Sequence, residues 1–287
     1  MISLPSQRRL TQGTIFCSAQ AEGYEDCPTW GIVITARCDA AHEKTQYVNY
    51  IPVVRIEDWL NRDGGLIIID RALSEHLNKF ANLLATKALS PSLIDSYAPE
   101  KIASTHFPPP KEGDMTKKSE RENKEAATAR ALAESITSLK AALQSTRPFG
   151  KTVEKTCKQH PKSLSSVVSD LLSHKLTSHY YLESIGNLTE SKSDLGYVAT
   201  LREVRYLPRD IALALADGII RESAPNPHYS QLNFNCFDFA YPIAQLDSPW
   251  VEHFMQAFCT MFGRIGLTDI DKSKSRFICE YFSAGAL

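Results

Sequence analysis

The stretch "TWGIVIT" (residues 29–35) is a short apolar run rich in β-branched and aromatic residues, which is typical of a buried β-strand. Two segments of the same character flank it, "GTIFCSA" (13–19) and "QYVNYIPVVRI" (46–56), and polar or turn residues separate all three. "LIIID" (66–70) fits either a fourth strand or the apolar start of a following helix. The close spacing of these segments favours a small barrel or a tightly curled sheet.

The pattern becomes helical after residue 70. Apolar residues such as Leu73, Leu77 and Phe80 recur at helical spacing, and segments 119–145 and 163–176 also predict helices. Between the first two helices, the prolines of residues 91–110 predict a linker or an extended crossover.

From residue 177 the chain reads as β again and then as helix. "SHYYLESI" (178–185) and "LGYVATLREVRYLP" (195–208) are strand-like, whereas segments starting at Pro208 and Ser248 predict amphipathic helices. We therefore expect an α+β protein, a small β-barrel interrupted by a helical insertion, with C-terminal helices packed on it. The expected parts are a first half of the barrel (1–70), a helical insertion with a Pro-rich linker (71–176), a second half of the barrel (177–207) and a C-terminal helical region (208–287).

Composition restricts the class of function. The formal net charge of −1 and the pI near 6.7 exclude a globally basic nucleic-acid binder. Residues 111–162 are locally basic, with twelve Lys or Arg against seven Asp or Glu. No apolar run is long enough for a membrane helix, no secretory signal stands at the N-terminus, and the seven cysteines form no CxxC pairs. We expect a cytoplasmic protein with reduced thiols, no membrane association, no metal and no cofactor.

The order of the strand segments resembles the MazF/PemK-like small barrel of toxin proteins. Gly13-Thr14, Ile32–Thr35, Tyr50–Val53 and Gly196–Arg205 stand at the four strand positions of that family, and residues 71–175 are then a large insertion. A "Cys-Asp" after the "VIT" strand and the helix "SPWVEHFMQAFCTMFGRIG" (248–266) also resemble an uncharacterised bacterial group. That second resemblance brings no activity with it.

The chain departs from the ribonuclease pattern of that family. The arginine that those enzymes carry just before the second strand is replaced here by Pro28, Thr29 and Trp30. The third strand is followed by Arg55 rather than by a hydroxyl residue. The resemblance therefore implies a barrel whose cleavage chemistry is absent or rebuilt.

The corner after the second strand, "ARCDAAH" (36–42), is the first candidate site. Cleavage of RNA needs a base near the 2′-hydroxyl and cations near the phosphate, and Arg37, Asp39 and His42 could supply them. Cys38 stands at the edge of the same surface. The competing interpretation is a simple strand end, with Cys38 buried, Asp39 capping the turn and His42 exposed.

Aromatic and basic residues also alternate in the second half of the barrel, where rings could stack on bases and arginines could hold a backbone. These candidate binding residues are Tyr180, Tyr181, Arg202, Arg205 and Tyr206. The competing interpretation is a strand with one core face and one solvent face, with tyrosines at the boundary.

No phosphate loop, nucleophile elbow, HExxH motif or paired-carboxylate signature is present. We therefore expect a non-catalytic binding component of a bacterial toxin–antitoxin or phage-defence system. It would engage a protein partner, and single-stranded RNA or another nucleic acid is a second ligand class. The alternatives are an active, metal-independent endoribonuclease toxin and a structural assembly subunit. The oligomeric state stays open.

Overall fold

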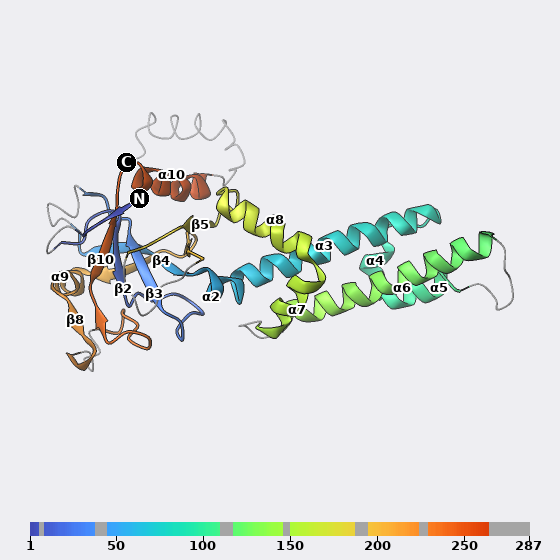
Figure 1. Cartoon of the computed structure of the whole chain (residues 1–287), viewed down its shortest axis with the longest axis horizontal. Coiled ribbons are helices and arrows are strands. Elements are labelled where there is room, and N and C mark those ends of the chain that lie inside the picture. The colour runs from blue at the N-terminus through green and yellow to red at the C-terminus, as the bar shows by residue number, and fades with distance from the viewer. Residues whose placement is uncertain are drawn as a thin grey trace, which may run out of the picture.

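The computed structural model describes residues 1–5, 9–37, 45–109, 117–145, 150–186, 195–223 and 229–263. A curled antiparallel sheet forms one end of the molecule, which we call the head, and a long helical arm extends from it (Figure 1). The chain is thus a mixed α and β protein, and its sheet forms a half-barrel.

Eight strands make up the sheet of the head, in the order β1-β10-β2-β3-β4-β6-β5, with β7 paired to β4. These strands are β1 (Ile2–Ser3), β2 (Thr14–Cys17), β3 (Thr29–Val33), β4 (Tyr47–Arg55), β5 (His179–Leu182), β6 (Tyr197–Thr200), β7 (Arg205–Pro208) and β10 (Pro242–Leu246). Two short strands, β8 (Ile219–Ile220) and β9 (Phe239–Ala240), pair separately.

Strand β4 is the centre of the curl because it serves three neighbours. Its residues Tyr50–Val54 pair with β3, Val53–Arg55 pair with β6, and Tyr47–Tyr50 pair with β7. The segment "LGYVATLREVRYLP" is therefore two strands with a corner between them, rather than one. This corner turns the sheet and places β7 beside the N-terminal half of β4.

Alternate side chains of the central strands enter two cores on the opposite faces of the sheet, as strand geometry requires. Ile15, Ile32 and Ile51 lie in one core with Phe254 of helix α10 (Trp250–Gly263). Residues of the other face, such as Phe16 and Val33, pack against helix α9 (Arg209–Asp217).

Gly31 of β3 is required by this packing. A Cβ atom at this position would lie 2.5 Å from the Phe16 ring and 2.8 Å from Tyr50. The Phe16 and Tyr50 rings can therefore cross the face of β3 edge to face, with centroids 5.1 Å apart.

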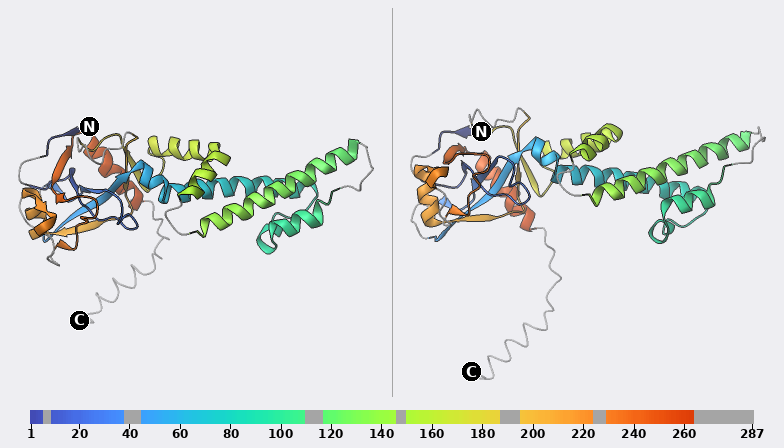
Figure 2. Two further views of the ribbon diagram at one scale, coloured as in Figure 1. Left: turned by 60° about the horizontal axis from the view of Figure 1, so that its bottom comes forward. Right: turned by 90° about the horizontal axis from the view of Figure 1, so that it is seen from below.

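The helical arm is built on α3 (Asp63–Thr86) and α6 (Lys117–Leu143), which run side by side (Figure 2). The "LIIID" segment belongs to α3, the second of its two sequence-based alternatives. Small residues of α6, Ala126, Ala129 and Ala133, are buried against Phe80 and Leu84 of α3. The other helices of the arm are α4 (Leu93–Ser96), α5 (Pro99–His106), α7 (Lys151–Gln159) and α8 (Pro161–Leu172).

The proline-rich segment differs from the extended linker that its composition predicts. Pro99 occupies the first turn of α5, where the missing N–H costs nothing because that position has no intrahelical acceptor. Ile102 and Ala103 of α5 are buried in the core of the arm. Burial of this apolar face favours a helix where proline count alone favours extension.

Arg62, between α2 (Ile56–Leu60) and α3, fastens the arm to the head. Its guanidinium is about nine-tenths buried, contacts the Gly23 carbonyl, pairs with Asp26 at 2.5 Å and lies 5.0 Å from the Tyr24 ring centroid. The Tyr24 hydroxyl donates to Asp63 Oδ2 at 2.9 Å. The loop before β3 is therefore tied to the start of the long helix.

The C-terminal region, expected to be helical, also contributes strand β10 to the sheet. Pro242 is tolerated there because it is the first residue of the strand. Of the phenylalanines predicted to form a core stripe on α10, Phe254 is fully buried, Phe258 is half-buried and Phe262 is exposed. The terminal segment "SRFICEYF" (275–282) lies outside the described residues.

Candidate functional site

A groove of about 860 Å³ opens beside the corner that joins β6 to β7. The corner is a tight turn in which the Glu203 N–H donates to the Thr200 carbonyl at 3.0 Å. Arg202, Arg205 and Tyr206, three of the residues predicted to bind, line this one groove. The loop after β2 forms its opposite side, with Gln20 and other residues.

Both signs of charge line this groove, and its carboxylates outnumber its arginines by three to two. Arg205 forms an ion pair with Glu203 and donates to Gln20 Oε1 at 3.2 Å. The same Glu203 carboxylate accepts the Glu22 N–H at 2.8 Å. Two arginines, Arg202 and Arg205, therefore stand with the carboxylates that line the groove, which are Glu22, Asp63 and Glu203.

Tyr50 forms the buried floor of the groove. Its hydroxyl accepts the Gln20 N–H at 3.2 Å, and burial raises the pKa of the phenol to about 12. Tyr50 is therefore protonated at neutral pH and does not serve as a base. Its role here is to hold the loop after β2 against β4.

Tyr206 also lines a second, smaller hollow of about 360 Å³, together with Tyr47. The two rings meet edge to face with centroids 5.0 Å apart. Tyr47 is 50% exposed and Tyr206 is 53% exposed, although each sits in a paired strand. An exposed aromatic pair beside an open groove is the distinctive feature of this face.

Tyr180 and Tyr181 lie elsewhere, on β5. Tyr180 is buried in the core, its hydroxyl is 2.7 Å from His253 Nδ1, and burial raises its pKa to about 12. Tyr181 packs over Gly196 and donates to the Leu195 carbonyl at 3.1 Å. Neither ring lines the groove with Tyr206, and Tyr180 offers no face for stacking.

The corner after β3 is described only as far as Arg37, which is exposed. Cys38, Asp39 and His42 lie outside the described residues, so the proposed catalytic set stays a prediction. Thr45, where description resumes, lines the small hollow with Tyr47. The Thr35 hydroxyl accepts the Asn49 N–H at 2.7 Å, which holds the start of this corner beside β4.

The cysteines of the described residues are not arranged as metal ligands. Cys17 and Cys27 lie in different cores, and burial raises the pKa of their thiols to about 11 and about 12. Within the described ranges, no group of three or more His, Cys, Asp or Glu side chains could hold a metal ion. No helix in the same ranges combines the length and the apolar character needed to cross a membrane.

Comparison of the chain with protein-family models, with curated proteins and with solved structures gave no match in any of the three. The candidate site therefore rests on its own geometry.

The sequence analysis did not single out Tyr47, Gln20 or Glu203. Tyr47 carried a usable signal, because polar Asn49 alternates with apolar Val48 and Tyr50, and Tyr47 shares the face of Asn49 in such a strand. Gln20 and Glu203 carried none. They stand 183 positions apart in the sequence. They line the same groove, and both contact Arg205, because β6 and β7 both pair with β4.

Proposed function

We propose that this chain is a non-catalytic binding component that engages a protein partner through the surface around Tyr47 and Tyr206. The observation that carries the proposal is the exposed, edge-to-face tyrosine pair beside the open groove of the head. Tyrosine and arginine are enriched at protein interfaces and among the residues that dominate binding energy.

The charge balance of the groove favours a protein over a nucleic acid as the ligand of this surface. A phosphate backbone is held mainly by an excess of Lys and Arg. Here three carboxylates oppose two arginines: Glu22, Asp63 and Glu203 line the groove with Arg202 and Arg205. Glu203 forms an ion pair with Arg205, so this arginine is not free to bind a phosphate. A mixed-charge rim around aromatic residues is the pattern of a protein interface.

The resemblance to the MazF/PemK-like barrel supports placing this partner in a toxin–antitoxin or phage-defence system. The segments that carry the resemblance contribute to β2, β3, β4 and β6, which are neighbours in the sheet. Arg205, at the end of the last of these segments, lines the groove.

Affinity capture from cells of the source organism tests the proposal. The baits are the wild-type chain, a Tyr47→Ser/Tyr206→Ser variant and a Tyr97→Ser control. Tyr97 is 52% exposed but lies on the arm, so its loss removes a comparable ring from a different surface. We expect one protein to be enriched by the wild type and by Tyr97→Ser but not by the double variant.

Calorimetry with the purified partner should then show a fall in affinity on the order of 100-fold for the double variant. Full retention of the partner by Tyr47→Ser/Tyr206→Ser would contradict the proposed surface. Incubation with single-stranded RNA and a chelator tests the ribonuclease alternative. Cleavage by the wild type that Arg37→Ala and His42→Ala abolish would establish that alternative instead.

A further inference from the structure

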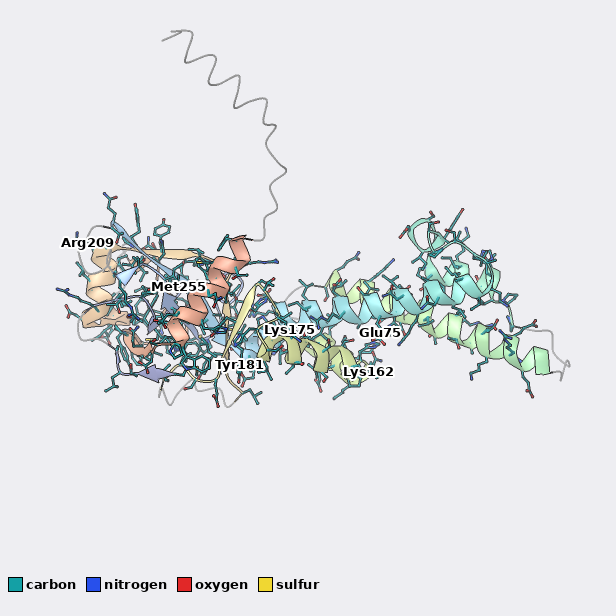
Figure 3. The ribbon with its side chains drawn as sticks, turned by 90° about the horizontal axis from the view of Figure 1, so that it is seen from above. Glu75, Lys162, Lys175, Tyr181, Arg209 and Met255 are labelled. Atoms are coloured by element: carbon teal, nitrogen blue, oxygen red, sulfur yellow. The ribbon has the colours of Figure 1, made fainter. Side chains whose placement is uncertain are left out.

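A second cleft, of about 1080 Å³, lies in the helical arm and is remote from the tyrosine pair. Helices α3, α6, α7 and α8 surround it, so four separate elements contribute to its walls. Figure 3 shows two of its lining residues, Glu75 on α3 and Lys162 on α8, facing each other across the arm.

The cleft has an excess of positive charge. Its four lysines come from three different helices, whereas two glutamates, Glu75 and Glu134, oppose them. The lysines are Lys79, Lys151, Lys155 and Lys162. Glu75 forms an ion pair with Lys79 at 2.6 Å and also attracts Lys162. All four lysines are exposed.

Lys151 and Lys155 have no ion pair with any described residue, in contrast to Lys158 on the same helix α7, which pairs with Glu154 at 2.6 Å. Lys162 is attracted to Glu75, which already pairs with Lys79. Lys151 begins α7 and Lys162 stands in the first turn of α8. The first turn of α8 adjoins the C-terminus of α7 at His160, so the two helix dipoles oppose each other there, and the positive charge of the cleft comes from its lysines.

Two histidines complete the wall. His76 and His160 meet edge to face with ring centroids 4.8 Å apart. His76 Nδ1 lies 2.8 Å from the Ala72 carbonyl, and because a carbonyl can only accept, Nδ1 carries the proton and Nε2 is left free. The His76 imidazole, held in this way, adds a directional polar group to a site whose lysines supply charge.

We propose that this cleft binds the phosphate group of a ligand. Lys151, Lys155 and Lys162 would neutralise the anion, and the hydroxyls of Ser138 and Thr152 in the wall would add donors to its oxygens. The phosphate could belong to a small phosphorylated molecule or to a nucleic-acid backbone, since both present the same chemistry to the lysines.

Binding of inorganic pyrophosphate and of a short oligouridylate to the full chain tests this assignment. Calorimetry measures the first and fluorescence anisotropy the second. A Lys155→Ser/Lys162→Ser variant should bind at least about tenfold more weakly, because each charge-assisted contact to a phosphate oxygen is strong. A clear preference for pyrophosphate indicates a small ligand, and a clear preference for the oligonucleotide indicates a backbone.

The matched control is Lys101→Ser/Lys158→Ser, which removes the same charge from the arm without touching the cleft. Circular dichroism verifies that both variants keep their helices. The proposal is overturned if the wild type binds neither probe, or if the control variant loses as much affinity as the cleft variant. This test is independent of the tyrosine surface, since Tyr206→Ser should leave phosphate binding unchanged.

Discussion

The buried cores of the head and of the arm contain side chains of different size. The cores of the head are filled by large, fully buried side chains such as Trp30, Tyr50 and Phe16, which pack on other aromatic rings. The arm buries alanines of α6 against α3, so that two long helices approach closely. The exposed surfaces also differ: the groove of the head combines a tyrosine with charges of both signs, and the cleft of the arm has an excess of lysines.

This contrast teaches that the two regions are suited to different ligands. An aromatic face with charges of both signs favours a protein, whereas a lysine-lined cleft favours an anion. Three of the twelve Lys and Arg residues of 111–162 line this cleft, where Lys79 of α3 joins them. The following predictions test how separate the two regions are.

Truncation in the core of the head should have the largest effect. Phe16 is fully buried and packs edge to face on Tyr50. We expect Phe16→Ala to lower the free energy of unfolding by about 3–5 kcal/mol, through lost burial and the cavity left behind. Urea unfolding followed by tryptophan fluorescence measures this, and Phe262→Ala, at an exposed position, should change it by less than about 0.5 kcal/mol.

Acid should weaken the contact between head and arm. His179 of β5 is buried, its ring lies 5.3 Å from that of Trp59, and burial lowers its pKa from 6.5 to about 4. Between pH 6.5 and 4, His179 is therefore protonated in the unfolded chain but neutral in the folded state. Stability contributed by neutral His179 is complete above pH 6.5 and is lost as pH falls towards 4, by about 3 kcal/mol in all.

Unfolding free energies at pH 7, 5.5 and 4 measure this loss. His179→Gln, which cannot titrate, should flatten the slope between pH 6.5 and 4. An unchanged slope would show that other groups carry the acid sensitivity, and His174 and His160, whose pKa values burial also lowers, would be the next to substitute.

Overpacking of the arm should have a smaller effect that stays local. Ala129 is fully buried between α6 and α3. Ala129→Leu should cost about 1–3 kcal/mol because the helices must separate to admit the larger side chain. Ala131→Leu, on the exposed face of the same helix, is the matched control.

Thermal unfolding of Ala129→Leu, followed by circular dichroism and by fluorescence, shows whether head and arm unfold together or separately. If the arm unfolds by itself, the helical circular dichroism of Ala129→Leu should melt earlier while the fluorescence transition of the buried tryptophans keeps its midpoint. Coincident shifts of both signals would contradict the separation between head and arm.

The smallest effect on stability should come from the candidate site itself. Tyr206→Ser removes an exposed ring and one cross-strand aromatic contact, so it should lower stability by no more than about 1 kcal/mol. Partner binding should nevertheless be lost. A large loss of stability instead would indicate that the tyrosine pair holds β7 to β4 rather than serving as a binding surface.

Much of the local structure could be predicted from the sequence. The first strands and the helices of the arm follow from period-2 and period-3.6 patterns, which depend only on neighbouring residues. The sequence did not reveal α5, whose prolines suggested extension, or β10, whose short "PIAQL" run carries too few residues for a clear period. Arg202, Arg205 and Tyr206 line one groove in part because they are close along the chain, and their role in binding stays a prediction.

By itself, then, the sequence determined which segments form strands and helices and which part of the chain is basic, because these properties are local. Only the tertiary structure decided which residues meet. Tyr47 meets Tyr206 because β4 pairs with β7, and His76 meets His160 because α7 and α8 fold back on α3. Such contacts join residues distant in sequence and depend on how faces pack, which no local pattern encodes.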